Sequence, residues 1–300
     1  MSEYSFLRYL KSKIAVDDRA LNKSVQNAAY DFLKSRSNPV SIAELGGGVG
    51  TMFTRLMKRL PESNFDYTIV DQDDALIGHA FEYIAEWCAA NNCEFNLLEK
   101  NAARIKRNGG ATTLRLVQAD AAKFLAAKTR AYDLVVAHAF LDLVDINAVL
   151  PLCFQSLKEG GGYYFSINYD GETRFEPVWN PALEEKILEA YNESMNQNPE
   201  GLSQRSTTGR RLPEAIVRHG GRVVAWGRSD WLVGPVGGIY PCDEGYFLWH
   251  ILHFFETSLS GFPGIVQQEL DDWLTERRRQ ITARELVYTA RQFDFFGLLN

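Results

Sequence analysis

The stretch that decides the fold is Ala43-Glu44-Leu45-Gly46-Gly47-Gly48-Val49-Gly50-Thr51, in which four glycines separate an apolar run from a helical pattern. The apolar run, Val40 to Leu45, predicts a strand, and the residues from about Thr51 to Leu60 predict a helix. Glycines between them permit a tight turn and let the backbone approach a ligand without a Cβ in the way. The helix amino terminus adds N–H groups that have no partner within the helix. The segment therefore predicts a ligand-binding loop.

The spacing of the glycines argues against two common phosphate-binding loops. A dinucleotide loop requires G-x-G-x-x-G, and counting from Gly46 and Gly48 the third glycine position holds Thr51. Counting from the next pair, that position holds Phe53. A P-loop requires Gly-Lys-Ser/Thr, which this segment lacks. The pattern that does fit is E-x-G-x-G-x-G, formed by Glu44, Gly46, Gly48 and Gly50.

This pattern resembles the first motif of the class I S-adenosylmethionine-dependent methyltransferases. The resemblance covers most of the chain from about residue 38 to 170 and, more loosely, the last two strands. It implies a doubly wound α/β fold with a mostly parallel seven-stranded sheet, and S-adenosylmethionine as the cofactor. A carboxylate at Glu44 suits the ammonium and sulfonium charges of this cofactor and would repel a pyrophosphate. A plain turn, with glycines present for packing, is the alternative.

Two acidic residues extend the resemblance along the sheet. Asp71 ends the second expected strand, where open sheets bring a carboxylate to ribose hydroxyls. Asp120 follows the third expected strand, and the resemblance implies that it accepts from the adenine amine while the backbone N–H of Ala121 contacts the ring. Gln72 occupies a position where many relatives carry an apolar residue, so we expect a different adenine contact. Helix capping is the alternative role for both acids. The predicted cofactor-binding residues are Glu44, Gly46, Gly48, Gly50, Asp71, Gln72, Asp120 and Ala121.

The methyl acceptor is expected over the carboxyl ends of the fourth and fifth strands. Methyl transfer from a sulfonium is an in-line displacement, so alignment can supply most of the catalysis, and acceptors of high pKa also need a base. His138 is the preferred base because an ordinary histidine titrates near neutral pH. A structural histidine at a strand end is the alternative. Asp142 could orient His138 or cap the next helix, and Tyr169 is a pocket group by its position.

Short apolar runs alternate with helical patterns along the chain, which is typical of a βαβ architecture. We expect helices over 74–90, 121–128, 183–195, 210–219, 246–258 and 266–279, and a helix ending near Leu157 that Gly160 to Gly162 stop. The polar stretch 91–110 is expected to be a helical fragment plus loop. The expected strands are 40–45, 67–71, 113–117, 132–137, 163–168, 222–227 and 286–296.

The remaining length is expected to surround the substrate. The sequence predicts two amino-terminal helices, Tyr4 to Lys13 and Asp18 to Lys34. We expect residues 1–37 to form a helical lid that folds over the cofactor. The methyltransferase domain then spans 38–300, with insertions at about 172–206 and 235–283. Aromatic residues are dense from 226 to 255, which indicates either a pocket for a planar acceptor or core packing. Arg277, Arg278 and Arg279 predict a solvated helix face, and a contact with an anionic substrate group or partner is the alternative.

Charge and composition limit the partners. With 32 Lys+Arg against 38 Asp+Glu the formal net charge is −6, which argues against broad binding to nucleic acid or anionic membranes. No apolar stretch approaches the roughly 20 residues of a membrane span, and the amino terminus lacks a secretory pattern. Four cysteines without a CxxC pair indicate reduced thiols and a cytoplasmic protein. We expect no metal site, although His250, His253 and Glu256 share a helix face.

The sequence thus favours an S-adenosylmethionine-dependent methyltransferase that acts on a small molecule. A methyltransferase-like protein that binds the cofactor or a partner without turnover is the second hypothesis. A nicotinamide oxidoreductase is a third, disfavoured by Thr51 in the glycine spacing. The atom that receives the methyl group and the oligomeric state are left open.

Overall fold

The computed structural model describes residues 4–197 and 204–299, and the chain divides into two compact units. The larger unit comprises residues 22–168, 210–227 and 293–300, and the smaller unit residues 1–21, 169–209 and 228–292. Both expected insertions fall within the smaller unit. The first 37 residues are divided between the two units at residue 21, and their role as a lid stays a prediction.

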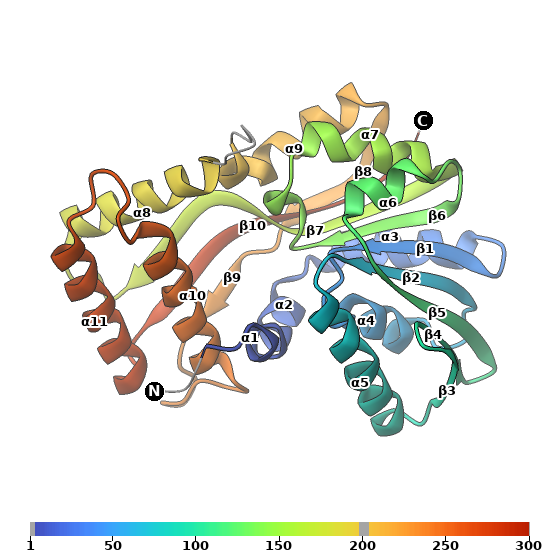
Figure 1. The fold of residues 1–300 in the computed structure, drawn as a ribbon, viewed down its shortest axis with the longest axis horizontal. Coiled ribbons are helices and arrows are strands. Elements are labelled where there is room, and N and C mark those ends of the chain that lie inside the picture. The colour runs from blue at the N-terminus through green and yellow to red at the C-terminus, as the bar shows by residue number, and fades with distance from the viewer. Residues whose placement is uncertain (1–3, 198–203, 300) are drawn as a thin grey trace. The chain divides into compact units, whose positions relative to one another are not determined.

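The larger unit is built on a doubly wound sheet, as the sequence predicts (Figure 1). The order of the described strands is β3-β4-β5-β2-β1-β6-β7-β10-β8, and β9 pairs with β10. The pairs β1–β2, β1–β6, β2–β5 and β6–β7 are parallel. The seven expected strands correspond to β1 (Val40–Leu45), β2 (Phe65–Asp71), β5 (Gly110–Gln118), β6 (Tyr132–His138), β7 (Leu157–Glu176), β8 (Gly221–Arg228) and β10 (Val287–Leu299). Three further strands, β3, β4 and β9, bring the described sheet to ten.

The strand order reverses between β1 and β6. From β1 the chain moves outward through β2 to β5, and then returns to place β6 on the other side of β1. Such a reversal opens a crevice at the carboxyl ends of the strands, because the connections leave in opposite directions there. The loops that follow β1 and β6 therefore meet at the place where open α/β sheets bind ligands.

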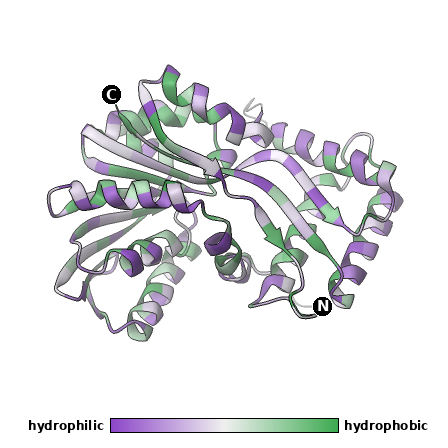
Figure 2. Cartoon of the chain, turned by 180° about the vertical axis from the view of Figure 1, so that it is seen from behind, coloured by the Kyte–Doolittle hydropathy of each residue, from purple (hydrophilic) through white to green (hydrophobic). Residues whose placement is uncertain are grey.

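Helices cover both faces of this sheet. Figure 1 shows α6 (Ala121–Ala126), α7 (Ile146–Ser156) and α9 (Thr208–Arg218) on one side, and α4 (Thr51–Arg59) and α5 (Asp74–Ala90) on the other. On the first side Leu125, Leu150 and Ile216 pack with strand residues Val135 and Phe165 in one buried cluster. The helices carry alternating hydrophilic and hydrophobic bands, as expected for helices that bury one face (Figure 2).

The stretch 91–110 corrects a sequence prediction. The expected helical fragment plus loop is instead an antiparallel pair, β3 (Glu94–Glu99) and β4 (Ala102–Arg107), at the edge of the sheet. Arg107 pairs with Gly110 across Asn108 and Gly109, both of which have positive φ. Asn-Gly is the preferred two-residue hairpin turn, since both positions require a left-handed backbone. That dipeptide was the signal that the sequence prediction missed.

Two further boundaries differ from the predictions. The expected helix Asp18 to Lys34 is broken, because Asn22 caps α3 (Lys23–Ser35) and α2 (Ile14–Ala20) ends before it. The helix expected to end near Leu157 ends at Ser156 in α7, but the three glycines expected to stop it lie within β7, which begins at Leu157 and not at 163. The prediction failed there because a glycine run stops a helix and also fits a strand where neighbouring backbone approaches closely.

The smaller unit has an aromatic and ionic core of its own. Its helices are α1 (Phe6–Ser12), α2, α8 (Pro181–Asn196), α10 (Glu244–Leu259) and α11 (Gln267–Ala283), and its strand β9 (Trp231–Val233) pairs with β10. Phe175 packs edge-on against Phe255 and Trp273. Arg277, expected in solvent, is fully buried beside these rings and pairs with Glu184. Its alkyl and planar guanidinium surfaces make such burial possible.

A buried carboxylate joins the amino-terminal ends of β1 and β6. Asp133 accepts hydrogen bonds from the backbone N and the hydroxyl of Ser41 at 2.9 and 2.7 Å. It also pairs with Arg36 at 3.0 Å and with Lys158 at 2.7 Å. Burial opposes ionisation, but these donors outweigh it and lower the pKa of Asp133 to about 2. The network therefore fixes the parallel pairing from the end opposite the glycine loop.

We predict that Asp133→Asn lowers the free energy of unfolding by roughly 1–2 kcal/mol at pH 7. The folded-state pKa of Asp133 lies below the ordinary 3.8, so its contribution is present above about pH 3.8 and is lost as the pH falls through about 2. Urea unfolding at a series of pH values measures the difference between variant and wild type. Asp66→Asn, at an exposed pair with Arg115, is the matched control and should have less effect. Equal effects of the two substitutions would contradict the prediction.

Candidate functional site

The loop between β1 and α4 uses the left-handed backbone at every second residue. Gly46, Gly48 and Gly50 have φ values of +60°, +53° and +83°. Side chains other than glycine are strained in that region, so the alternating spacing follows from the shape of the turn. A Cβ on Gly46 would also collide with the ring of Phe140. Because Phe140 follows β6, this contact shows that the loops after β1 and β6 meet at the reversal point.

Asp71 holds the glycine loop at the carboxyl end of β2. Its Oδ2 accepts the backbone N–H of Gly48 at 2.8 Å, and its Oδ1 accepts that of Asp73 at 3.0 Å. Asp73, and not Asp71, caps α5 through hydrogen bonds to Ala75 and Leu76. Each carboxylate oxygen can accept more than one hydrogen bond. Asp71 is therefore oriented by the backbone and chemically able to accept the hydroxyls of a ribose.

Glu44 lies beneath the glycine loop. Its side chain is only 1% exposed and accepts the hydroxyl hydrogen of Tyr67 at 2.8 Å. Burial raises the pKa of Glu44 to about 8, although the Tyr67 hydroxyl and the Arg55 charge oppose the rise. Most molecules therefore carry a neutral carboxyl at this position near pH 7. The sequence prediction assumed a carboxylate facing the positive charge of the cofactor.

The predicted adenine contacts lie at the carboxyl end of β5. The backbone N of Ala119 donates to the backbone O of Asp71 at 2.9 Å, which ties this end to that of β2. Asp120 is exposed and caps α6 by accepting the N–H of Lys123 at 2.9 Å. Gln72 is exposed and Ala121 is buried. The capping role proposed as the alternative for Asp120 is thus present, and an adenine contact stays a prediction.

His138, the predicted base, has contacts at both ring nitrogens. Its Nδ1 lies 2.8 Å from the Ser166 hydroxyl, and its Nε2 lies 3.3 Å from Nη1 of Arg55. A guanidinium only donates hydrogen bonds, so Nε2 must accept in this contact. A neutral ring that carries its proton on Nδ1 and donates it to Ser166 satisfies both contacts. In this arrangement the basic nitrogen faces Arg55.

The other two predicted catalytic residues are placed differently. Asp142 lies in a short 3₁₀ helix (Leu141–Leu143) after β6, and the helix cap that it could have formed belongs to Asp145. Tyr169 belongs to the smaller unit. Its hydroxyl lies 2.9 Å from that of Thr173 and donates to Oδ1 of Asn192 at 3.0 Å. The hydroxyl of Tyr169 is thus part of a polar cluster within that unit.

Sequence reasoning missed Arg55. It lies one helical turn after the glycine loop, is partly buried, and its Nη1 donates to the Thr51 hydroxyl at 3.1 Å. The spacing of four residues from Thr51 places both on one face of α4. A single arginine in a helix that also contains Lys58 and Arg59 forms no recognisable motif. The contact with His138 in the folded protein is what distinguishes Arg55 from Lys58 and Arg59 as a site residue.

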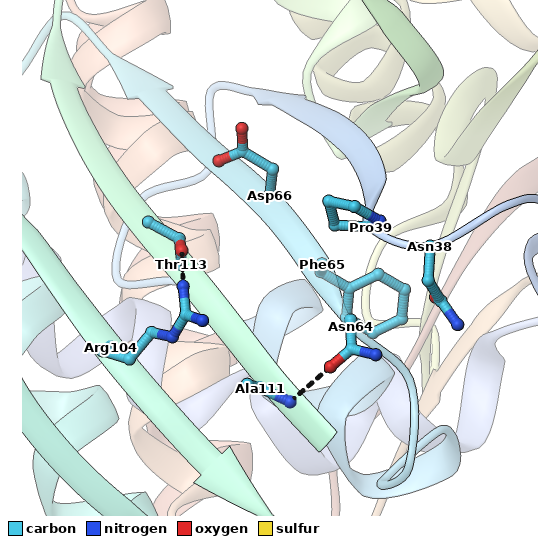
Figure 3. A pocket seen from close by; sticks show the side chains of 8 residues that line it. All are labelled: Asn38, Pro39, Asn64, Phe65, Asp66, Arg104, Ala111 and Thr113. Carbon is cyan, nitrogen blue, oxygen red and sulfur yellow. Dashed lines mark hydrogen bonds between the residues drawn. The ribbon is translucent and has the colours of Figure 1, made fainter.

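Two cavities lie at the other end of the sheet. One, of about 300 Å³, is lined by residues that begin β1 and β2, including Pro39, Asn64 and Phe65 (Figure 3). The other, of about 410 Å³, lies beside Asp133 and its partners Arg36 and Lys158. Both are at the amino-terminal ends of the strands, whereas the glycine loop follows the carboxyl end of β1. The predicted ligand site therefore rests on the loop geometry and on Asp71.

The described residues contain neither a membrane-spanning helix nor a metal cluster. Within 4–197 and 204–299 no helix is long and apolar enough to cross a membrane. The same residues contain no group of three or more His, Cys, Asp or Glu side chains that could hold a metal ion. In the smaller unit the imidazole of His253 stacks on Tyr4 with the ring centroids 3.8 Å apart.

We predict that Glu44→Gln removes part of the pH dependence of stability. The ordinary pKa of 4.5 rises to about 8 on folding, so the folded state holds an extra proton between these values. The stabilising contribution is complete below pH 4.5 and is lost as the pH rises through about 8. Glutamine accepts from Tyr67 at every pH and stays neutral. The free energy of unfolding of the variant, measured relative to that of wild type, should therefore increase with pH across this window. The increase is at most about 1.4 kcal/mol per pH unit.

Urea unfolding at pH 5, 6.5 and 8 tests the Glu44 prediction. A constant difference between the two proteins at all three pH values would show that Glu44 is ionised in the folded state.

Comparisons with known proteins find similarity only among solved structures. No family model matches the chain, and no curated protein matches it. An S-adenosylmethionine-dependent methyltransferase from Thiobacillus denitrificans, in complex with S-adenosyl-L-homocysteine, is 14% identical with a TM-score of 0.49, and 100% of each chain is covered. One from Geobacter sulfurreducens with the same ligand is 13% identical, also with a TM-score of 0.49 and 100% of each chain covered.

A third similar structure is a geranyl diphosphate C-methyltransferase from Streptomyces coelicolor. It is 13% identical with a TM-score of 0.43, and the match covers 92% of this chain and 80% of that one.

Proposed function

We propose that this protein binds S-adenosylmethionine at the carboxyl ends of β1, β2 and β5 and transfers its methyl group to a small-molecule acceptor. The observation that carries the proposal is the 2.8 Å hydrogen bond from Gly48 N to Asp71 Oδ2. It joins the glycine loop and the ribose-binding acid, two features predicted separately from the sequence. Both lie in the larger unit beside the reversal of strand order.

The residues present fit the parts of this cofactor. Asp71 is oriented to accept the ribose hydroxyls, and Asp120 lies one strand further out, where an adenine would follow. The glycine loop removes side chains from the place where the backbone would approach the ligand. The amino terminus of α4 carries no side-chain cap, so its N–H groups face the same region. None of these features requires a ligand with a phosphate group, such as a dinucleotide.

When bound, S-adenosylmethionine supplies an electrophilic methyl group on a sulfonium. The chain's part in the proposed reaction is to align an acceptor in line with that bond, which can account for a large share of the rate. His138 stands at the end of β6, where the acceptor is expected, with Nδ1 held by Ser166. It would take a proton at Nε2 from an acceptor of high pKa, provided that the contact with Arg55 is exchanged.

A second candidate is a protein that binds the cofactor without turnover. The observation that favours it is that both ring nitrogens of His138 face protein groups, Ser166 and Arg55. Under that alternative the contacts among His138, Ser166 and Arg55 would only stabilise the fold. Release of S-adenosylhomocysteine in a screen of metabolite extracts with labelled S-adenosylmethionine separates the two functions, because only turnover produces it.

We predict that isothermal titration calorimetry detects binding of S-adenosylmethionine or S-adenosylhomocysteine to the full chain, and that Asp71→Ala weakens it at least tenfold. Loss of a charged hydrogen-bond acceptor to a ribose hydroxyl accounts for a change of about this size. Asp73→Ala removes a neighbouring carboxylate that only caps α5, and is the matched control for local unfolding.

No binding of either compound at millimolar concentration would refute the proposed cofactor. Binding of NAD in their place would favour the oxidoreductase alternative. An unchanged affinity in Asp71→Ala, with Asp73→Ala also unchanged, would remove Asp71 from the site.

A further inference from the structure

We propose that Arg55 recognises the carboxylate at the amino-acid end of the cofactor. This inference rests on the proposed function, and it assigns to the site a residue that the sequence motifs do not include. Its basis is the order of polar groups along the sheet, the local contacts of Arg55 and the character of the nearest buried acid.

The order of the strands sets the direction in which the ligand would extend. Asp120 follows β5, Asp71 ends β2, and the next strands in the sheet are β1 and β6. A ligand with its adenine near Asp120 and its ribose near Asp71 must continue over β1 towards β6. Three strand spacings separate β5 from β6, or about 14 Å. The amino-acid end is therefore directed to the crevice between the loops that follow β1 and β6.

The contacts of Arg55 place its guanidinium in that crevice. It belongs to α4, which begins directly after Gly50, and its guanidinium lies 3.1 Å from the Thr51 hydroxyl. The same nitrogen lies 3.3 Å from His138, at the end of β6. The guanidinium thus lies between the loops that follow β1 and β6. The order of the strands directs the amino-acid end of the ligand to the same place.

The charges around Arg55 also favour a carboxylate as its partner. Glu44, under the loop, interacts electrostatically with Arg55. Burial keeps most of the Glu44 carboxyl neutral near pH 7, because its pKa is about 8. A carboxylate brought in by a ligand would therefore be attracted to Arg55 without strong repulsion from Glu44. The planar guanidinium offers two parallel donors to such a group, and this makes arginine the preferred partner of carboxylates.

The experiment compares two ligands that differ in one part. S-adenosylhomocysteine carries the amino-acid end, and 5′-methylthioadenosine has the same adenosine and a thioether but lacks that end. Calorimetry measures the affinity of wild type and Arg55→Gln for each. We expect Arg55→Gln to weaken S-adenosylhomocysteine by about 10- to 100-fold, the range of a charged hydrogen-bonded pair. The affinity for 5′-methylthioadenosine should change less than about twofold, because that ligand has no carboxylate for Arg55 to bind.

Three variants serve as controls. Arg59→Gln makes the same change of charge one turn further along α4, at an exposed position, and should leave both affinities unchanged. Asp71→Ala should weaken both ligands together, since both contain the ribose. Arg55→Lys keeps the charge but not the paired donors, and should weaken S-adenosylhomocysteine less than Arg55→Gln does. Thermal unfolding of each variant shows whether the fold is kept.

The outcomes separate this inference from the proposed function. If wild type binds neither ligand, the proposed function fails and Arg55 has no cofactor to recognise. If wild type binds both and Arg55→Gln weakens both equally, or weakens neither, the cofactor assignment stands and the role of Arg55 is overturned. Selective loss of S-adenosylhomocysteine in Arg55→Gln, with Arg59→Gln unchanged, supports it.

Discussion

The hydrogen bond between the Gly48 backbone and the Asp71 carboxylate is the interaction on which the candidate site depends. It closes a loop whose three alternating glycines have left-handed backbone, and so holds a conformation that few other residues adopt. The same carboxylate binds the N–H of Asp73 and thereby sets the start of α5. The Asp71 side chain thus fixes both the loop that follows β1 and the turn that follows β2. Its orientation exists before any ligand arrives, which lowers the entropic cost of binding.

Three polar side chains in the larger unit form a second layer around this loop. Glu44 is buried beneath it with a raised pKa, Arg55 lies one turn beyond it, and His138 faces Arg55 from the end of β6. Burial penalises isolated charges. The Tyr67 hydroxyl and the Arg55 charge oppose the effect of burial on the pKa of Glu44, and the His138 ring contacts both Ser166 and Arg55.

The smaller unit shows a different use of polar groups. Arg277 is buried among Phe175 and Trp273 and is paired with Glu184, so its charge serves the packing of α8 and α11. Within the same unit α1 is joined to α10 through an ion pair of Arg8 with Asp243 and through hydrogen bonds between Ser5 and Tyr246. Aromatic residues that the sequence left open as pocket or core, such as Phe247 and Phe255, are buried. The buried aromatic residues therefore stabilise the unit, whereas Trp226 is exposed.

The sequence by itself determined the central βαβ pattern, the glycine loop and the position of Asp71, because these depend on local periodicity and on residues that one backbone shape requires. β1 and α5 have the bounds that were expected. β3 and β4 were missed although Asn108-Gly109 marks the hairpin between β4 and β5, since the exposed edge strand β3 lacks a strong apolar alternation. Only the tertiary structure decided that Glu44 is buried and that Arg55 meets His138. Arg55 and His138 are 83 residues apart in the sequence, and the order of the strands in the sheet brings them together. The same order decides which side chains are buried, because neighbouring strands and helices cover them.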